Sequence, residues 1–160
     1  MKLDSLPIVV VDTCLYIHLL TNQNPSLAER TQGVLDDNNQ NHRVLLPAIV
    51  RAEAVGVARS HALGKRDTPT KRRKAAEVAI EFFESQDFVF AELDERLIEI
   101  AEKLIPEYGL RGADASILAT AIAHDAQFLY TQDRQLLKVK DKIPNLRVQE
   151  PPEPNHLVFE

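Results

Sequence analysis

The chain has no tryptophan and a single cysteine, Cys14, among its 160 residues. A lone cysteine excludes an internal disulfide framework and a cluster of thiolate metal ligands. No apolar run approaches the length of about 20 residues that a membrane-spanning helix needs, and the first residues show no apolar signal-peptide core. We therefore expect a cytoplasmic protein without a membrane partner.

Several catalytic chemistries also find no support in the sequence. The five glycines do not form a phosphate-binding loop, and the five histidines have no metal-ligand spacing. No histidine and acid are placed to activate Cys14, so we expect its thiol to pack rather than to attack a substrate. His18 is expected to be an ordinary polar residue of a helix.

The remaining composition is ordinary for a globular protein, with 44% hydrophobic and 27% charged residues. The length predicts one domain with a sizeable core. We place this domain at residues 1–148 and expect residues 149–160, which include Pro151, Pro152 and Pro154, to form a flexible tail.

Apolar runs that are typical of buried strands alternate with stretches that are typical of helices. Strands are predicted at residues 7–11, 44–46, 88–90, 128–130 and 146–148. Helices are predicted at residues 13–20, 26–36, 48–63, 68–85, 94–105, 113–124 and 134–139. Ser26 is predicted as a cap, and Pro106 and Gly109 are predicted to end the helix that begins at residue 94. This alternation predicts an α/β fold, a three-layer sandwich in which helices flank a central parallel sheet.

Four acidic residues stand where a predicted strand ends or a predicted helix begins. Asp12 closes the first strand and Asp133 follows the fourth. Glu53 lies in the second turn of the helix after the second strand, and Asp114 opens a later helix. The carboxyl ends of parallel strands share the sheet edge where α/β proteins bind ligands. Carboxylates gathered there repel one another unless a cation neutralises them, so the pattern predicts a Mg²⁺ or Mn²⁺ site.

Each of these acids, taken alone, also has a purely structural explanation. Aspartate is a favoured residue at a helix start, so Asp12, Asp114 and Asp133 could each cap the helix that follows. Glu53 could be a solvated helix residue. The shared sheet edge favours the joint interpretation as a metal site over four independent caps and surface residues.

The formal net charge of −5 disfavours a general polyanion binder, but the charges are segregated. Residues 59–74 contain seven basic residues against one acid, Asp67. Within this stretch, Lys71, Arg72, Arg73 and Lys74 are candidates for a local contact with nucleic acid. A solvated helix end explains the same pattern, and the sequence leaves both interpretations open.

The motifs around the four acids resemble those of the PIN domain, a metal-dependent ribonuclease fold known from the VapC toxins of toxin–antitoxin pairs. The resemblance rests on IVVVDT at 8–13, PAIVRAE at 47–53, GADA at 112–115 and TQD at 131–133. It spans about residues 8–139. It implies that the four acids hold one or two Mg²⁺ or Mn²⁺ ions and that Thr13 and Thr131 supply hydroxyl groups beside them.

Within that implied site, the four carboxylates are expected to have different roles. Mg²⁺ is usually held by few direct carboxylates and keeps several waters. We therefore expect Asp12 and Asp114 to lie closest to the metal, and Glu53 and Asp133 to orient water. Arg111, beside a helix start, is expected to bind phosphate of the RNA.

The function expected from the resemblance is that of a toxin which cleaves structured RNA of the tRNA or rRNA class. It further implies a cognate antitoxin protein and a homodimer. A non-toxin RNA-processing nuclease, or an RNA- or protein-binding module with weak or lost catalysis, are the alternatives. A phosphotransfer protein fits poorly, because position 14 is Cys14 where haloacid-dehalogenase-like enzymes have a second aspartate.

Overall fold

The computed structural model describes residues 6–61 and 68–154. Within these residues, a five-stranded sheet with strand order β3-β2-β1-β4-β5 forms the centre. All neighbouring strands are parallel. The strands are β1 (Ile8–Val11), β2 (Arg43–Pro47), β3 (Val89–Ala91), β4 (Phe128–Tyr130) and β5 (Arg147–Gln149). The predicted parallel α/β architecture is confirmed.

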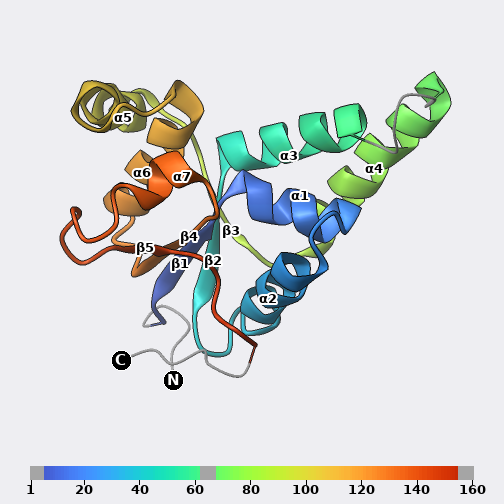
Figure 1. Cartoon of the computed structure of the whole chain (residues 1–160), viewed down its shortest axis with the longest axis horizontal. Helices are drawn as coiled ribbons and strands as arrows, with labels where there is room; N and C mark the ends of the chain where they lie inside the picture. The colour runs from blue at the N-terminus through green and yellow to red at the C-terminus, as the bar shows by residue number, and fades with distance from the viewer. Residues whose placement is uncertain (1–5, 62–67, 155–160) are drawn as a thin grey trace.

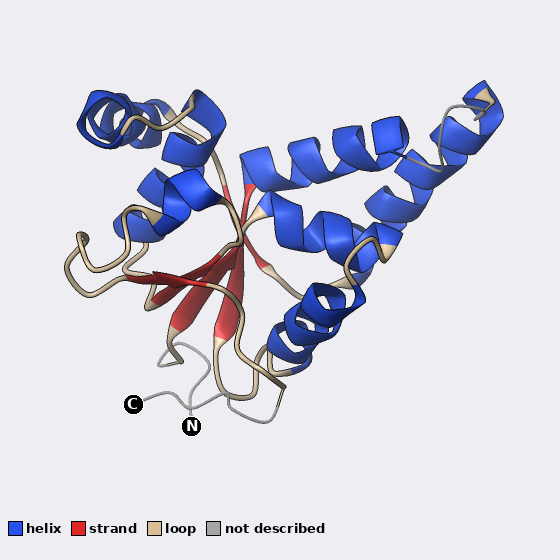
Figure 2. Ribbon diagram, in the orientation of Figure 1, coloured by secondary structure: helices blue, strands red, loops and turns tan. Residues whose placement is uncertain are grey.

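Helices cover both faces of this sheet and complete three layers (Figures 1 and 2). One side holds α1 (Thr13–Thr21), α2 (Pro25–Asp36), α3 (Ala48–His61) and α4 (Pro69–Ser85). The other side holds α5 (Glu95–Tyr108), α6 (Gly112–Ala123) and α7 (Arg134–Leu137). None of the helices in the described part of the chain combines the length and apolar character needed to cross a membrane.

The core lies around the middle strand, β1. Val9, Val10 and Val11 are completely buried, because helices cover them on both faces of the sheet. Branched side chains suit such a doubly covered parallel strand. Helix α6 approaches the sheet through small residues, among them Ala115 and Ala119, which are also completely buried. This close packing brings the start of α6 to the carboxyl ends of the strands.

Several helix boundaries differ from the predictions by one to three residues, and the start of α2 and the end of α5 have clear physical reasons. Asn24, and not Ser26, caps α2: its side-chain oxygen accepts the Leu27 N–H at 3.1 Å. Pro25 occupies the first turn, where its missing N–H costs nothing, and the cap therefore lies two residues earlier than predicted. Pro106 lies inside α5, which continues to Tyr108; the predicted end at Gly109 is confirmed, and this residue has the left-handed conformation (φ 66°).

Helices α3 and α4 pack against each other as an arm that projects from the body (Figure 1). We call this pair the α3–α4 arm. Residues 62–67, which join the two helices and include the basic Lys65 and Arg66, lie outside the described residues. The base of the arm is anchored by aromatic contacts, because Tyr16 of α1 packs edge-on against Phe83 with ring centroids 5.2 Å apart.

The start of the predicted tail lies against helix α2. The Nε of Arg30 donates to the Pro151 carbonyl at 2.7 Å, and Pro151 is buried. Pro154 packs over Gly33, where a side-chain β-carbon would stand 3.5 Å from it. Residues 155–160 lie outside the described residues, so the expected flexibility of that part stays a prediction.

Candidate active site

Asp12 occupies the junction between β1 and α1 and is held from several directions. Its Oδ1 accepts the Thr13 N–H at 2.7 Å, which caps α1. Its Oδ2 accepts the Thr131 hydroxyl at 2.7 Å and the Cys14 thiol at 3.3 Å. The residue is 3% exposed. The carboxylate is therefore both buried and fixed in one orientation.

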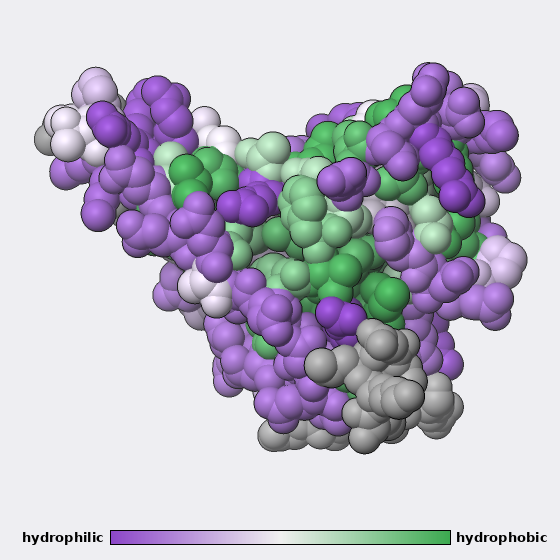
Figure 3. Space-filling model, turned by 180° about the vertical axis from the view of Figure 1, so that it is seen from behind, coloured by the Kyte–Doolittle hydropathy of each residue, from purple (hydrophilic) through white to green (hydrophobic). Residues whose placement is uncertain are grey.

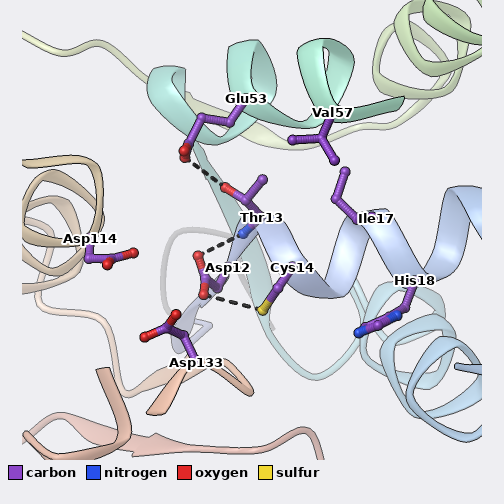
Figure 4. A pocket seen from close by; sticks show the side chains of 9 residues that line it. All are labelled: Asp12, Thr13, Cys14, Ile17, His18, Glu53, Val57, Asp114 and Asp133. Carbon is purple, nitrogen blue, oxygen red and sulfur yellow. Dashed lines mark hydrogen bonds between the residues drawn. The ribbon is translucent and has the colours of Figure 1, made fainter. Parts of the chain in front are cut away.

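Glu53 reaches the same cleft from α3. The Thr13 hydroxyl donates to Glu53 Oε1 at 3.0 Å, which links the second turn of α3 to the first turn of α1 (Figure 4). Thr13 thus contacts Glu53, one of the four acids that the sequence predicts at this edge of the sheet. Glu53 and Asp12 are joined through adjacent groups of this one residue.

Asp114 and Asp133 come from the other side of the sheet. Arg111 is the N-cap residue of α6, and Asp114 lies in the first turn, so the structure does not bear out the purely structural alternative of Asp114 as a cap. Asp133 caps α7 through its Oδ1, which accepts the N–H groups of Gln135 and Leu136 at 2.8 and 3.2 Å. The carboxylates of Asp12, Asp114 and Asp133 turn toward one another (Figure 4). Capping and lining the cleft are thus combined in Asp133.

Burial and mutual repulsion change the acidity of these groups. Desolvation raises the pKa of Asp12 from 3.8 to about 6, although the hydrogen bonds from Thr131, Cys14 and Thr13 oppose the rise. Desolvation also raises the pKa of Asp114, and the charge of Asp133 adds to it, while Arg111 lowers it. Burial and the charge of Asp12 raise the pKa of the Cys14 thiol, which remains a protonated donor.

A hard divalent cation suits this set of oxygen atoms. Asp114 Oδ2 is buried, and no hydrogen-bond donor among the described residues reaches it. Arg111 Nε lies 3.6 Å from this oxygen, which makes an ionic contact and not a hydrogen bond. An unsatisfied buried carboxylate oxygen is costly, and a Mg²⁺ or Mn²⁺ ion would satisfy it.

The spacing of the acids limits how such an ion can be held. In residues 6–61 and 68–154, no three His, Cys, Asp or Glu side chains are grouped closely enough to bind one ion. The arrangement thus suits an ion with one or two direct carboxylates, and the remaining acids would act through water, as Mg²⁺ commonly allows.

The cleft also contains residues that sequence reasoning assigned to other roles. Cys14 and His18 line it together with the acids, four positions apart on α1 (Figure 4). A ring nitrogen of His18, Nε2, shares a hydrogen bond with Gln132 Oε1 and links α1 to the loop before Asp133. The spacing of four between Cys14 and His18 was a usable signal that the two share one side of α1, because residues four apart lie on the same side of a helix.

The predicted RNA-binding residues fall in two places. Arg111 stands beside the acids and pairs with Asp114 and Asp133. The basic residues of α4 are exposed on the arm and do not line the cleft. One of them, Arg73, bonds Glu77 at 2.9 Å. The basic residues of α4 are Lys71, Arg72, Arg73 and Lys74.

Comparison with known families gives one assignment over most of the chain. The family model of the PIN domain matches residues 9–142. No curated protein matches the sequence.

Solved structures of toxin–antitoxin proteins share the fold. A VapBC2 structure from Rickettsia felis, bound to a promoter DNA fragment, aligns with a TM-score of 0.61, 18% identity, 89% of this chain and 98% of that chain. VapC20 from Mycobacterium tuberculosis, described as a sarcin–ricin loop cleaving toxin, aligns with a TM-score of 0.62 and 16% identity over 78% of this chain and 89% of that chain. FitAcB from Neisseria gonorrhoeae aligns with a TM-score of 0.59 and 23% identity over 93% of this chain and 99% of that chain. At these identities the likeness establishes the fold.

Proposed function

The chain belongs to the PIN domain family, and we propose that it is a Mg²⁺- or Mn²⁺-dependent endoribonuclease that acts as the toxin of a toxin–antitoxin pair. One observation supports the nuclease assignment above the others. Four acids from both sides of the sheet converge on one cleft, and a buried oxygen of Asp114 lacks a hydrogen-bond donor among the described residues. Such a cleft suits a metal-assisted hydrolysis of phosphodiesters.

The residues of the cleft would have different roles in this reaction. A bound divalent ion would neutralise charge on the phosphate and make an attacking water more acidic. Asp12 and Asp114, whose oxygens face the centre of the cleft, would hold it. Glu53 and Asp133, at the two sides, would accept hydrogen bonds from water. Thr131 supports Asp12 by its hydroxyl, and Thr13 supports Glu53 in the same way.

Charge distribution supports RNA as the substrate. The basic residues of α4 stand on a projecting arm of an otherwise acidic protein. Glu53 is in the second turn of α3, and a helix rises 1.5 Å per residue, so the end of α3 at His61 is about 12 Å further out. The arm would therefore contact RNA that flanks the cleavage position. A folded RNA of the tRNA or rRNA class presents phosphates in both places.

Exposed apolar surface supports protein partners. Hydrophobic side chains fill the hollow between the α3–α4 arm and α5 on the face seen in Figure 3. In the described chain, large hydrophobic side chains are more than a third exposed on α4, on β3, after β3 and on α5. They are Val78, Ile80, Phe90, Leu93, Ile98 and Ile105. Such surface marks interaction sites, and we propose a homodimer and a cognate antitoxin protein as its partners.

Inducible expression of the wild type and of Asp12→Asn, followed by mapping of new RNA 5′ ends, tests this function. Growth arrest with discrete new ends in the wild type alone is expected, because Asp12 is central to the cleft. Discrete ends without growth arrest would point to an RNA-processing nuclease. No new ends from either protein in cells supplied with Mg²⁺ would contradict the nuclease and favour a binding module.

A further inference from the structure

Arg111 stands against two of the four acids and is held there by charge alone. Its Nε lies 3.6 Å from Asp114 Oδ2, and its Nη2 lies 3.8 Å from Asp133 Oδ2. Both distances exceed those of hydrogen bonds. The Arg111 side chain is 78% exposed, whereas those of Asp114 and Asp133 are 14% and 25% exposed. Exposed ionic contacts of this kind are weak and easily exchanged.

The contact with Arg111 compensates a repulsion between the two acids. The charge of Asp133 raises the pKa of Asp114, and Arg111 lowers it. The guanidinium is therefore a single positive charge in the place where a divalent cation would bring two. A divalent ion next to Asp114 would repel the guanidinium and remove the negative charge that attracts it.

Arg111 lies between the acids and a second hollow beside the cleft. The two hollows share Cys14, His18 and Asp133. The second is also lined by Arg111, Gln132, Arg134 and Gln135. Two guanidinium groups and two side-chain amides form a surface with many hydrogen-bond donors, which suits phosphate and sugar oxygens of a nucleic acid.

We propose that Arg111 is a charge latch that couples metal binding to RNA binding. Without a divalent ion, its guanidinium pairs with Asp114 and Asp133. A divalent ion on the carboxylates would release the guanidinium from them, and in the second hollow, which Arg111 and Arg134 both line, the two would bind a phosphate next to the one that is cleaved. The latch rests on the proposed function, because it requires the divalent ion in the acidic cleft.

This coupling has a consequence in both directions. The ion frees Arg111 for RNA, and RNA draws Arg111 away from the acids that bind the ion. Each ligand therefore strengthens the binding of the other by the same factor, as linkage requires. The ion-free protein keeps Arg111 on the acids and binds RNA weakly.

Calorimetric titration with Mn²⁺ alone tests the first half of the latch. Arg111→Gln removes the competing charge, so it should bind Mn²⁺ about two- to fivefold more tightly than the wild type, the range expected for an exposed ion pair. Arg111→Lys keeps the charge and should bind Mn²⁺ like the wild type. Arg147→Gln is the matched control, because Arg147 begins β5 at the opposite edge of the sheet and lies over Phe128.

Fluorescence anisotropy with a labelled single-stranded RNA tests the second half. Binding is measured in EDTA and in Ca²⁺, a cation that also takes oxygen ligands. The wild type should bind more tightly in Ca²⁺, and Arg111→Gln should lose most of that gain. The slope of log affinity against log salt in Ca²⁺ should fall by about 0.7 in this variant, the loss of one phosphate contact on a single strand.

The outcomes separate the latch from the metal site itself. Wild-type binding of Mn²⁺ with equal or weaker binding by Arg111→Gln would overturn the latch and leave the metal site standing. Failure of the wild type to bind Mn²⁺ any better than Asp12→Asn would overturn both. Tighter Mn²⁺ binding by Arg111→Gln together with its loss of the Ca²⁺-dependent gain supports the latch.

Discussion

Individual side chains in the cleft are held by hydroxyl groups whose importance can be measured. Thr131 is completely buried; its hydroxyl donates to Asp12 Oδ2 at 2.7 Å and accepts the Asp133 N–H at 2.9 Å. One residue thus orients two of the four acids. Thr13 has the corresponding role for Glu53. The sequence named both threonines only through the family resemblance, because a hydroxyl partner across the sheet leaves no local pattern.

Thr131→Val is expected to lower the free energy of unfolding by about 1–3 kcal/mol, because it leaves buried polar groups without their partner. Urea denaturation measures the change. Thr31→Val is the matched control: Thr31 is also completely buried, but its hydroxyl has no hydrogen-bond partner in the described chain. This control should be neutral or stabilising. Equal losses in the two variants would show that the Thr131 hydroxyl is not a significant support for the acids.

Among the elements, the helices provide both the site and its approach. Asp12 is the N-cap of α1 and Asp133 is the N-cap of α7, so two of the acids also cap the helices that follow them. The α3–α4 arm connects the site to surface charge, because it begins near Glu53 and displays the basic residues of α4 further out. The sequence left open whether these basic residues face substrate or only solvent.

Neutralising the basic residues of α4 tests the role of the arm. The variant Lys71→Gln, Arg72→Gln, Arg73→Gln, Lys74→Gln should bind single-stranded RNA more weakly. The slope of log affinity against log salt should fall by up to about 3, since each phosphate contact contributes about 0.7. Cleavage at saturating RNA should stay unchanged, because these residues do not line the acidic cleft.

A control that removes positive charge from another helix distinguishes the arm from net charge. Arg96→Gln with Lys103→Gln removes positive charge from exposed positions of α5 and should leave the salt slope unchanged. If the α4 variant also leaves it unchanged, the basic residues face away from the substrate. Anisotropy across a salt series gives both slopes.

For the whole molecule, the acidic cleft should make stability depend on pH and on metal. The pKa of Asp12 is about 6 in the folded protein against an ordinary value of 3.8. The folded state therefore binds the proton more tightly, and stability falls as pH rises from about 4 to above 6. The shift corresponds to about 3 kcal/mol for this buried group. The raised pKa of Asp114 acts in the same direction.

Thermal denaturation without metal should show this loss in the wild type. Asp12→Asn has no such proton to lose. As pH rises, its Tm should therefore increase relative to that of the wild type, by about 2–4 °C for each kcal/mol of stability that the wild type loses. Saturating Mn²⁺ at pH about 8 should then raise the Tm of the wild type by mass action, and that of Asp12→Asn much less. If the Tm values of the two proteins changed in parallel with pH and responded equally to Mn²⁺, the raised pKa of Asp12 and its role in metal binding would both be contradicted.

Much of the architecture could be read from local patterns. Branched apolar runs, helical spacing and turn residues are properties of short windows, and they were sufficient for the strands, the parallel sheet and the placing of all four acids at its carboxyl edge. The wrong boundaries of α2 and α5 have local causes. Asn24, and not Ser26, caps α2 because Pro25 fits its first turn, and α5 accommodates Pro106 in its last turn.

The contacts that give the cleft its chemistry could not be read in this way. The bond from Thr131 to Asp12 spans 119 positions, and the link from His18 to Gln132 spans 114. The pairing of Arg111 with Asp133 likewise depends on how α6 and α7 meet above the sheet. Such contacts arise from the packing of whole elements, and a side chain's partner there depends on distances that no short window contains. The residue types come from the chain, and their burial, acidity and pairing come from the fold.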